Sequence, residues 1–155
     1  MGRTNSIRLS RRHEWFAYVT SALVFLTGAA WAWLHYLRVS PNEFGGRNPA
    51  ESWILKAHGA AAMLTLVLIG TLLPMHVKFA WRARRNLRTG LTLLNLFAFL
   101  VLTGYGLYYV GGERLRAWTS AAHLWVGPAL PLILVWHIWR GKKSEVRKSK
   151  PWVVG

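Results

Sequence analysis

Long stretches without a charged side chain alternate with short basic segments along this chain. Asp, Glu, Lys and Arg are absent from residues 15–37, 57–77, 89–112 and 117–139. Each stretch has 21 to 24 residues, and about 20 apolar residues in a helix cross the hydrocarbon core of a bilayer. The pattern predicts an all-α integral membrane protein, a four-helix bundle over 15–140 between a basic head (1–14) and a basic tail (141–155). The expected helices cover about 15–37, 52–79, 89–110 and 115–140.

The charges orient these helices. Twenty Lys and Arg against five Asp and Glu give a net charge of +15. The head, the segment 78–88 and the tail from residue 140 hold 15 of the basic residues, and the other two connections hold five. Basic residues gather on the cytoplasmic side of membrane proteins, so both termini are predicted to be cytoplasmic. Topology and contact with anionic lipid account for most of the charge, and we expect no nucleic-acid partner.

Several kinds of chemistry are excluded by composition. The chain has no cysteine, which excludes disulfides, covalently attached c-type haem and cysteine-ligated iron–sulfur clusters. No acidic residue lies in the four uncharged stretches, which argues against a carboxylate di-iron site. Nucleotide and flavin motifs are also lacking, so we expect a redox subunit more than a complete enzyme. Pro74, Pro128 and Pro131 fall inside predicted helices, where each is expected to kink the backbone.

Six histidines carry the candidate chemistry. They are His13, His35, His58, His76, His123 and His137. A ligating side chain inside a span is costly and is therefore a functional hypothesis by default. At about 100° per residue, His58 and His76 share a face of one helix, and His123 and His137 nearly share a face of another. The topology places His58 and His123 near the outer surface and His76 and His137 near the inner surface.

Two pairs of facing imidazoles suit two six-coordinate haems held in a bundle core. We expect His58 with His123 to ligate one haem iron, and His76 with His137 to ligate the other. Small residues after His58, and Gly127 after His123, would make room for the macrocycle. Basic residues at the helix ends could neutralise haem propionates: Lys56, Lys78, Arg82, Arg116 and Arg140.

Other interpretations of the histidines stay open at this point. A single haem, another metal, or no cofactor would also be compatible with them, since histidines near the interface can extend toward water. His13 could replace His76 opposite His137. His35 could hydrogen-bond a propionate, relay a proton or lie in the interface.

The two halves of the chain are faintly alike. The tripeptide Leu-Thr-Gly occurs at 26–28 and again at 102–104, at similar depth in the first and third predicted helices. In each half, the following helix carries one histidine near its start and another near its end. This pattern suggests a duplicated helical hairpin.

The segment HLWVGPALPLILVWHIW (123–139) resembles the last helix of small di-haem cytochrome b membrane proteins. These include the b-type subunits that anchor hydrogenases and formate dehydrogenases. FLTG at 25–28 and VLTGYGLYY at 101–109 are similar to the first and third helices of that group. The resemblance covers about residues 12–140 and implies one axial ligand for each haem from His123 and His137. It implies an inner-haem ligand from His13 in the dehydrogenase-anchor branch, or from His76 in related short proteins.

The function expected from these features is one-electron transfer across the bacterial cytoplasmic (inner) membrane through two b-type haems. Besides the lipid bilayer, the expected partners are a quinone and either a c-type cytochrome or a dehydrogenase. The aromatic region around Tyr105, Tyr108 and Tyr109 could hold a quinone head group. The main alternative is a cofactor-free anchor or assembly subunit that packs through Gly28, Gly70 and Gly104. A small proton-coupled transporter is a third class, although the buried acids typical of it are absent.

Overall fold

The structure is a computed structural model, and it describes residues 11–37, 48–82, 84 and 86–149. Most of the predicted head, the first outer connection and the end of the predicted tail lie outside the described residues. In the described part of the chain, the regular secondary structure is entirely helical. The helices form two compact units, which divide between Phe79 and Ala80.

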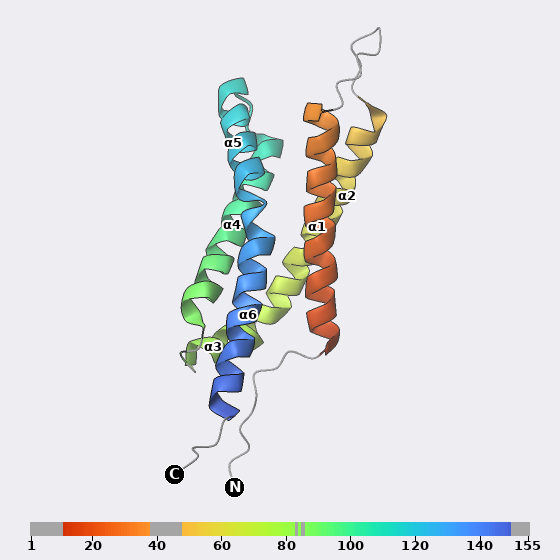
Figure 1. The fold of residues 1–155 in the computed structure, drawn as a ribbon. Helices are drawn as coiled ribbons and strands as arrows, with labels where there is room; N and C mark the ends of the chain where they lie inside the picture. Colours follow the sequence, from red (N-terminus) through yellow and green to blue (C-terminus); the bar gives the residue numbers. More distant parts are fainter. Residues whose placement is uncertain (1–10, 38–47, 83, 85, 150–155) are drawn as a thin grey trace, which may run out of the picture. The chain divides into compact units, whose positions relative to one another are not determined.

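The first unit is a helical hairpin of α1 (Arg11–Leu37) and α2 (Pro49–Leu72), which run side by side in opposite directions (Figure 1). α2 begins earlier than predicted because Asn48 and Pro49 form a favourable helix start. The Asn48 side chain accepts a hydrogen bond from the Ala50 N–H at 3.0 Å. Pro49 takes the first helical position, where its missing N–H costs nothing.

The second predicted helix is not one continuous α-helix. After α2, a π-helical turn covers Leu73–Val77, and the short helix α3 covers Lys78–Arg82. Pro74 explains the change, because it has no N–H and its ring would meet the carbonyl of Gly70 in a regular α-helix. A π-helical turn widens the helix locally and removes that conflict.

The second unit pairs α4 (Leu87–Tyr109) with α5 (Glu113–Val126) and α6 (Ala129–Ser149) (Figure 1). The predicted fourth helix is interrupted at Gly127–Pro128, because Pro128 cannot donate to the carbonyl one turn before it. Pro131 lies in the first turn of α6, where a missing N–H is tolerated, so the interruption belongs to Pro128. α6 also continues into residues 141–149, which the sequence pattern placed in the tail.

Four segments of the described chain are long and apolar enough to cross a membrane: Arg11–Leu37, Pro49–Leu72, Leu87–Tyr109 and Glu113–Lys143. Large apolar side chains on them are exposed, such as Leu102 (71%) and Trp125 (83%). Hydroxyls in the spans donate to carbonyls of their own helices, as Thr65 does to Ala61 at 2.9 Å, so these groups need no water. The chain therefore has the features of a multi-pass membrane protein. The packing of the two units into one bundle stays a prediction.

Candidate functional site

His58 contacts a threonine and a glycine of the facing helix. Its Nδ1 lies 3.1 Å from the Thr27 hydroxyl oxygen and 3.0 Å from the Val24 carbonyl oxygen, both on α1. The next residue, Gly28, lies directly against the ring. A Cβ atom there would be 3.1 Å from His58 Cε1, a separation tighter than ordinary contacts. The close approach of α1 to this imidazole therefore favours glycine, because a methyl group there would make the ring shift by a few tenths of an ångström.

His123 has the same kind of neighbours in the second unit. Its Nδ1 lies 2.9 Å from the hydroxyl oxygen of Thr103 on α4. A Cβ atom on Gly104 would be 3.3 Å from His123 Cε1. Thr103 and Gly104 belong to the second Leu-Thr-Gly tripeptide, as Thr27 and Gly28 belong to the first. The faint likeness between the halves thus corresponds to a shared contact.

His137 repeats the arrangement near the start of α4. Its Nδ1 lies 2.9 Å from the Thr89 hydroxyl oxygen, and Thr89 itself is buried. A Cβ atom on Gly90 would be 3.4 Å from His137 Cε1. We call each of these three arrangements a Thr–Gly–His contact.

The two contacts of the second unit share one register. Thr89 and Thr103 are 14 residues apart, and so are His123 and His137. α4 runs opposite to α5 and α6. Moving 14 residues back along α4, from Thr103 to Thr89, therefore corresponds to moving 14 residues forward from His123 to His137. Fourteen residues correspond to about 21 Å of helix, nearly four turns, which keeps the second contact close to the same helix face.

His76 lies in the π-helical turn Leu73–Val77 and is partly buried. It is 18 residues beyond His58, not 14, and follows Pro74 by two residues. Single-turn π-helices often mark functional sites. The fourth predicted ligand is therefore positioned by different local structure from the other three.

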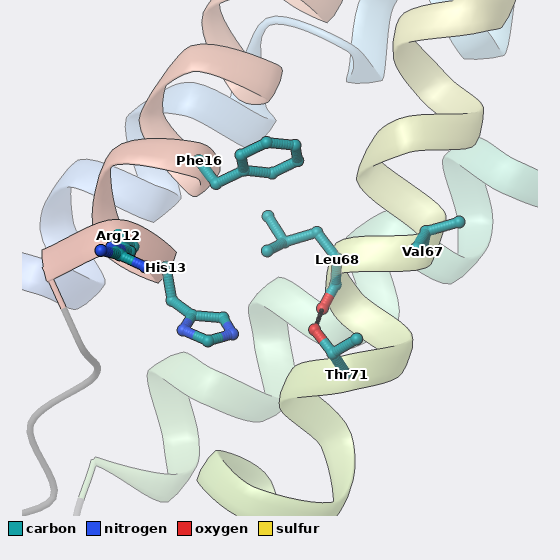
Figure 2. A pocket seen from close by; sticks show the side chains of 6 residues that line it. All are labelled: Arg12, His13, Phe16, Val67, Leu68 and Thr71. Carbon is teal, nitrogen blue, oxygen red and sulfur yellow. Dashed lines mark hydrogen bonds between the residues drawn. The ribbon is translucent and has the colours of Figure 1, made fainter.

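His13 lines a pocket within the first unit. The pocket has a volume of about 260 Å³ and is lined by three residues of α1 and three of α2: Arg12, His13, Phe16, Val67, Leu68 and Thr71. Figure 2 shows Phe16 and Leu68 pointing toward each other across it, with the His13 ring beside them. His13 thus places its imidazole in the wall of a largely apolar cavity.

His35 belongs to a separate cluster at the other end of the same hairpin. Its Nδ1 lies 3.2 Å from a carboxylate oxygen of Glu51, and its ring stacks on Trp31 at 4.6 Å between centroids. Tyr36 meets the His35 ring edge-on at 4.8 Å. These contacts are made within the first hairpin, and the role of His35 stays open.

Other predicted contributors lie on exposed helix surfaces. The Lys56 amine lies 4.5 Å from the centre of the Trp53 ring, and the Arg140 guanidinium lies 5.5 Å from the centre of the Trp136 ring. Such cation–aromatic pairs suit the edge of a membrane. The tyrosines 105, 108 and 109 of the suggested quinone region are exposed on α4.

Thr27, Thr89, Thr103 and Gly90 were not identified from the sequence as neighbours of the histidines. A repeated dipeptide in the sequence would have pointed to them. Thr-Gly occurs at 27–28, 89–90 and 103–104. The 14-residue spacing of the last two equals the spacing of His123 and His137. The glycines that allow a helix to approach each imidazole belong to the facing helix, whereas only small residues beside each histidine were considered from the sequence.

The three contacts fit axial ligation of haem. A ligating histidine almost always donates its other ring N–H to a nearby acceptor, which fixes the orientation of the ring. Since Nδ1 of each ring is hydrogen-bonded inside its hairpin, Nε2 is the nitrogen that would bind iron. Among the described residues, no three His, Asp or Glu side chains gather to hold a bare metal ion. The pairing of His58 with His123, and of His76 with His137, joins the two units and stays a prediction.

Comparison of the chain with known proteins found no matching family model, no matching curated protein and no matching solved structure. The functional assignment therefore depends on the chemistry of the site itself.

Proposed function

We propose that this protein transfers electrons across a membrane through two bis-histidine b-type haems. His58 and His123 would hold one haem, and His76 and His137 would hold the other. The protein would act as a membrane redox subunit. It would pass electrons between quinol, or a partner at the membrane face, and another redox protein such as a c-type cytochrome or a dehydrogenase.

The observation that supports this proposal is the repetition of the Thr–Gly–His contact. Three of the four proposed ligands are held by a hydroxyl at Nδ1 and by a glycine against Cε1. A histidine that only extends toward the interface needs neither neighbour. Orientation of the ring by a second group, together with close packing around it, is what a positioned metal ligand requires.

The residues of the chain have distinct parts in this mechanism. Bound haem would supply a one-electron couple, Fe(III)/Fe(II), inside the apolar layer. The imidazoles would bind through Nε2, and the threonine hydroxyls would hold each ring in place. The uncharged spans would exclude water from the site, and the absence of acidic residues in them leaves no carboxylate to compete for the metal.

We also propose that the protein lies in the bacterial cytoplasmic membrane with both termini inside. The uneven distribution of Lys and Arg supports this orientation. Because the chain has no cysteine, a single introduced cysteine can report on which side of the membrane its position lies. In intact cells, an impermeant maleimide should label Glu113→Cys and leave Lys143→Cys unlabelled until the cells are opened. The reverse labelling would overturn the orientation.

The proposed function is tested by spectroscopy on the purified protein. Reduced-minus-oxidised visible spectra in detergent should show sharp b-type α-bands, with about two haems per chain. His35→Ala is the matched control, because this histidine lies in its own cluster with Glu51 and Trp31 and should leave the haem content unchanged. A colourless protein that does not take up added haem would overturn the proposal and favour an anchor or assembly subunit.

A further inference from the structure

Each threonine of the three contacts also bonds to its own helix. The Thr27 hydroxyl donates to the Leu23 carbonyl at 2.6 Å, and the Thr103 hydroxyl donates to the Phe99 carbonyl at 2.9 Å. The Thr89 hydroxyl donates to the Asn86 carbonyl at 3.2 Å. A carbonyl oxygen can only accept, so the hydroxyl must be the donor in each of these bonds.

Counting protons links this bond to the bond with histidine. A hydroxyl has one hydrogen. When the carbonyl of the same helix receives it, the threonine oxygen accepts toward histidine, and the ring nitrogen Nδ1 carries the proton. His58 gives an independent check, because its Nδ1 also lies 3.0 Å from the Val24 carbonyl, which can only accept.

We propose that Thr27, Thr89 and Thr103 are positioning residues that hold His58, His137 and His123 as Nδ1–H tautomers, each with Nε2 as the metal-binding nitrogen. The tautomer itself does not depend on the proposed function; only its consequence for haem does. Donation from Nδ1–H makes the imidazole a stronger electron donor. The threonines would therefore favour the oxidised iron and lower the reduction potential of each haem.

A threonine suits this position in a membrane. Polar groups in a span must be satisfied within the protein. The hydroxyl satisfies the ring N–H of the neighbouring helix while its own hydrogen satisfies a helix carbonyl. Valine has nearly the same shape as threonine but has no hydroxyl to accept or donate a hydrogen bond. Thr→Val therefore tests the hydrogen bond alone, and Thr→Ser keeps it.

The first test reads the tautomer without haem. The full-length protein, labelled with ¹⁵N-histidine, is prepared from haem-limited cells, and its ring nitrogens are observed by NMR in lipid. We expect protonated Nδ1 and unprotonated Nε2 at His58, His123 and His137. Thr103→Val should abolish this preference at His123, and Thr103→Ser should keep it. Thr27→Val should have a smaller effect on His58, because the Val24 carbonyl still accepts from Nδ1.

The second test uses the haem-loaded protein. Thr103→Val should raise the midpoint potential of one haem and weaken haem binding by about 10–100-fold, the usual cost of losing such a partner. Thr103→Ser should keep both the midpoint potential and the haem affinity close to those of the wild type. Thr92→Val is the matched control, because Thr92 lies on the same helix and donates to the Arg88 carbonyl at 2.9 Å in the same manner.

The outcomes separate this inference from the proposed function. Protonated Nε2 in the wild-type protein, or a folded Thr103→Val protein with an unchanged tautomer and potential, would overturn the inference. If Thr103→Val does not fold, the tautomers measured in the wild-type and Thr103→Ser proteins still test the inference. A wild-type protein with the expected tautomer that binds no haem would overturn the proposed function and support the inference.

Discussion

In the unit formed by α4, α5 and α6, two histidines contact two Thr-Gly pairs in one register, whereas the α1–α2 hairpin has one such contact. Stepping back 14 residues from Thr103 leads to Thr89, which holds His137. The same step back from Thr27 leads to His13. The same step forward from His58 leads to Leu72, and His76 follows four residues later.

The difference shows that the two hairpins share one site and differ at the other. Where the second unit has the contact between Thr89 and His137, the first unit has a pocket lined by His13 (Figure 2). Its second histidine follows Pro74 in a π-helical turn. A common arrangement thus holds His58 and His123, while the two units differ at the position that Thr89 and His137 occupy in the second unit.

The largest expected effect comes from removing the proposed ligands. His123→Ala and His137→Ala should each lose one haem per chain or convert it from low-spin to high-spin, because an axial ligand is missing. His76→Ala should do the same, and His13→Ala should keep both haems. Visible spectra and the haem-to-protein ratio measure this. Loss of a haem in His13→Ala with retention in His76→Ala would assign the inner ligand to His13.

A smaller effect is expected when the glycines of the contacts receive a methyl group. Gly28→Ala should be the most damaging, followed by Gly104→Ala and then Gly90→Ala, in the order of the distances from the added Cβ to the imidazole. Overpacking of this kind costs about 1–3 kcal/mol at Gly28 and Gly104, whereas Gly90→Ala, whose Cβ would lie at the edge of ordinary contact, should cost less. Thermal unfolding in detergent and haem retention measure the order.

Gly70 offers a matched control on α2. A Cβ there meets nothing within 4 Å among the described residues, so Gly70→Ala should be neutral or stabilising by about 0.5–1 kcal/mol. Equal damage from Gly70→Ala and Gly28→Ala would show that the close contact with His58 is not the cause.

A more local effect is expected at Asn86, which precedes α4 in a left-handed conformation (φ 53°). Its side chain donates to the His137 carbonyl at 3.4 Å. Asn86→Val should destabilise the protein by about 1–2 kcal/mol, because a β-branched residue is strained at this φ. Asn86→Gly relieves the backbone and should cost less. Thermal unfolding compares the two, and equal losses would assign the effect to the side-chain hydrogen bond.

The smallest effect is expected at the cluster of His35 and Glu51. Glu51→Gln should change stability by no more than about 1 kcal/mol, because a single partly exposed contact between a histidine and a carboxylate contributes little, even when both groups are charged. The haem content should be unchanged. Haem loss in this variant would instead place His35 and Glu51 at the cofactor site.

Much of the fold follows from the order of residues along the chain. Four uncharged stretches predict four spans, since a bilayer selects apolar helices about 20 residues long. Pro128 interrupts the last span through local backbone chemistry that was expected from the sequence, whereas the helix start at Asn48 and Pro49 was missed by three residues although the same chemistry is written there. Helical periodicity also singled out His58 with His76, and His123 with His137, as candidate ligands, and their role stays a prediction.

Only tertiary structure identified what holds these histidines. Thr27 and His58 are 31 residues apart, and Thr89 and His137 are 48 apart. In its own helix, each of these threonines resembles any other threonine whose hydroxyl bonds to a nearby carbonyl. The hydroxyl oxygen accepts a second hydrogen bond only when the packing of two helices brings an imidazole to it. That packing gives three ordinary Thr-Gly pairs a contact with a histidine ring of the facing helix, and this contact sets how the ring lies.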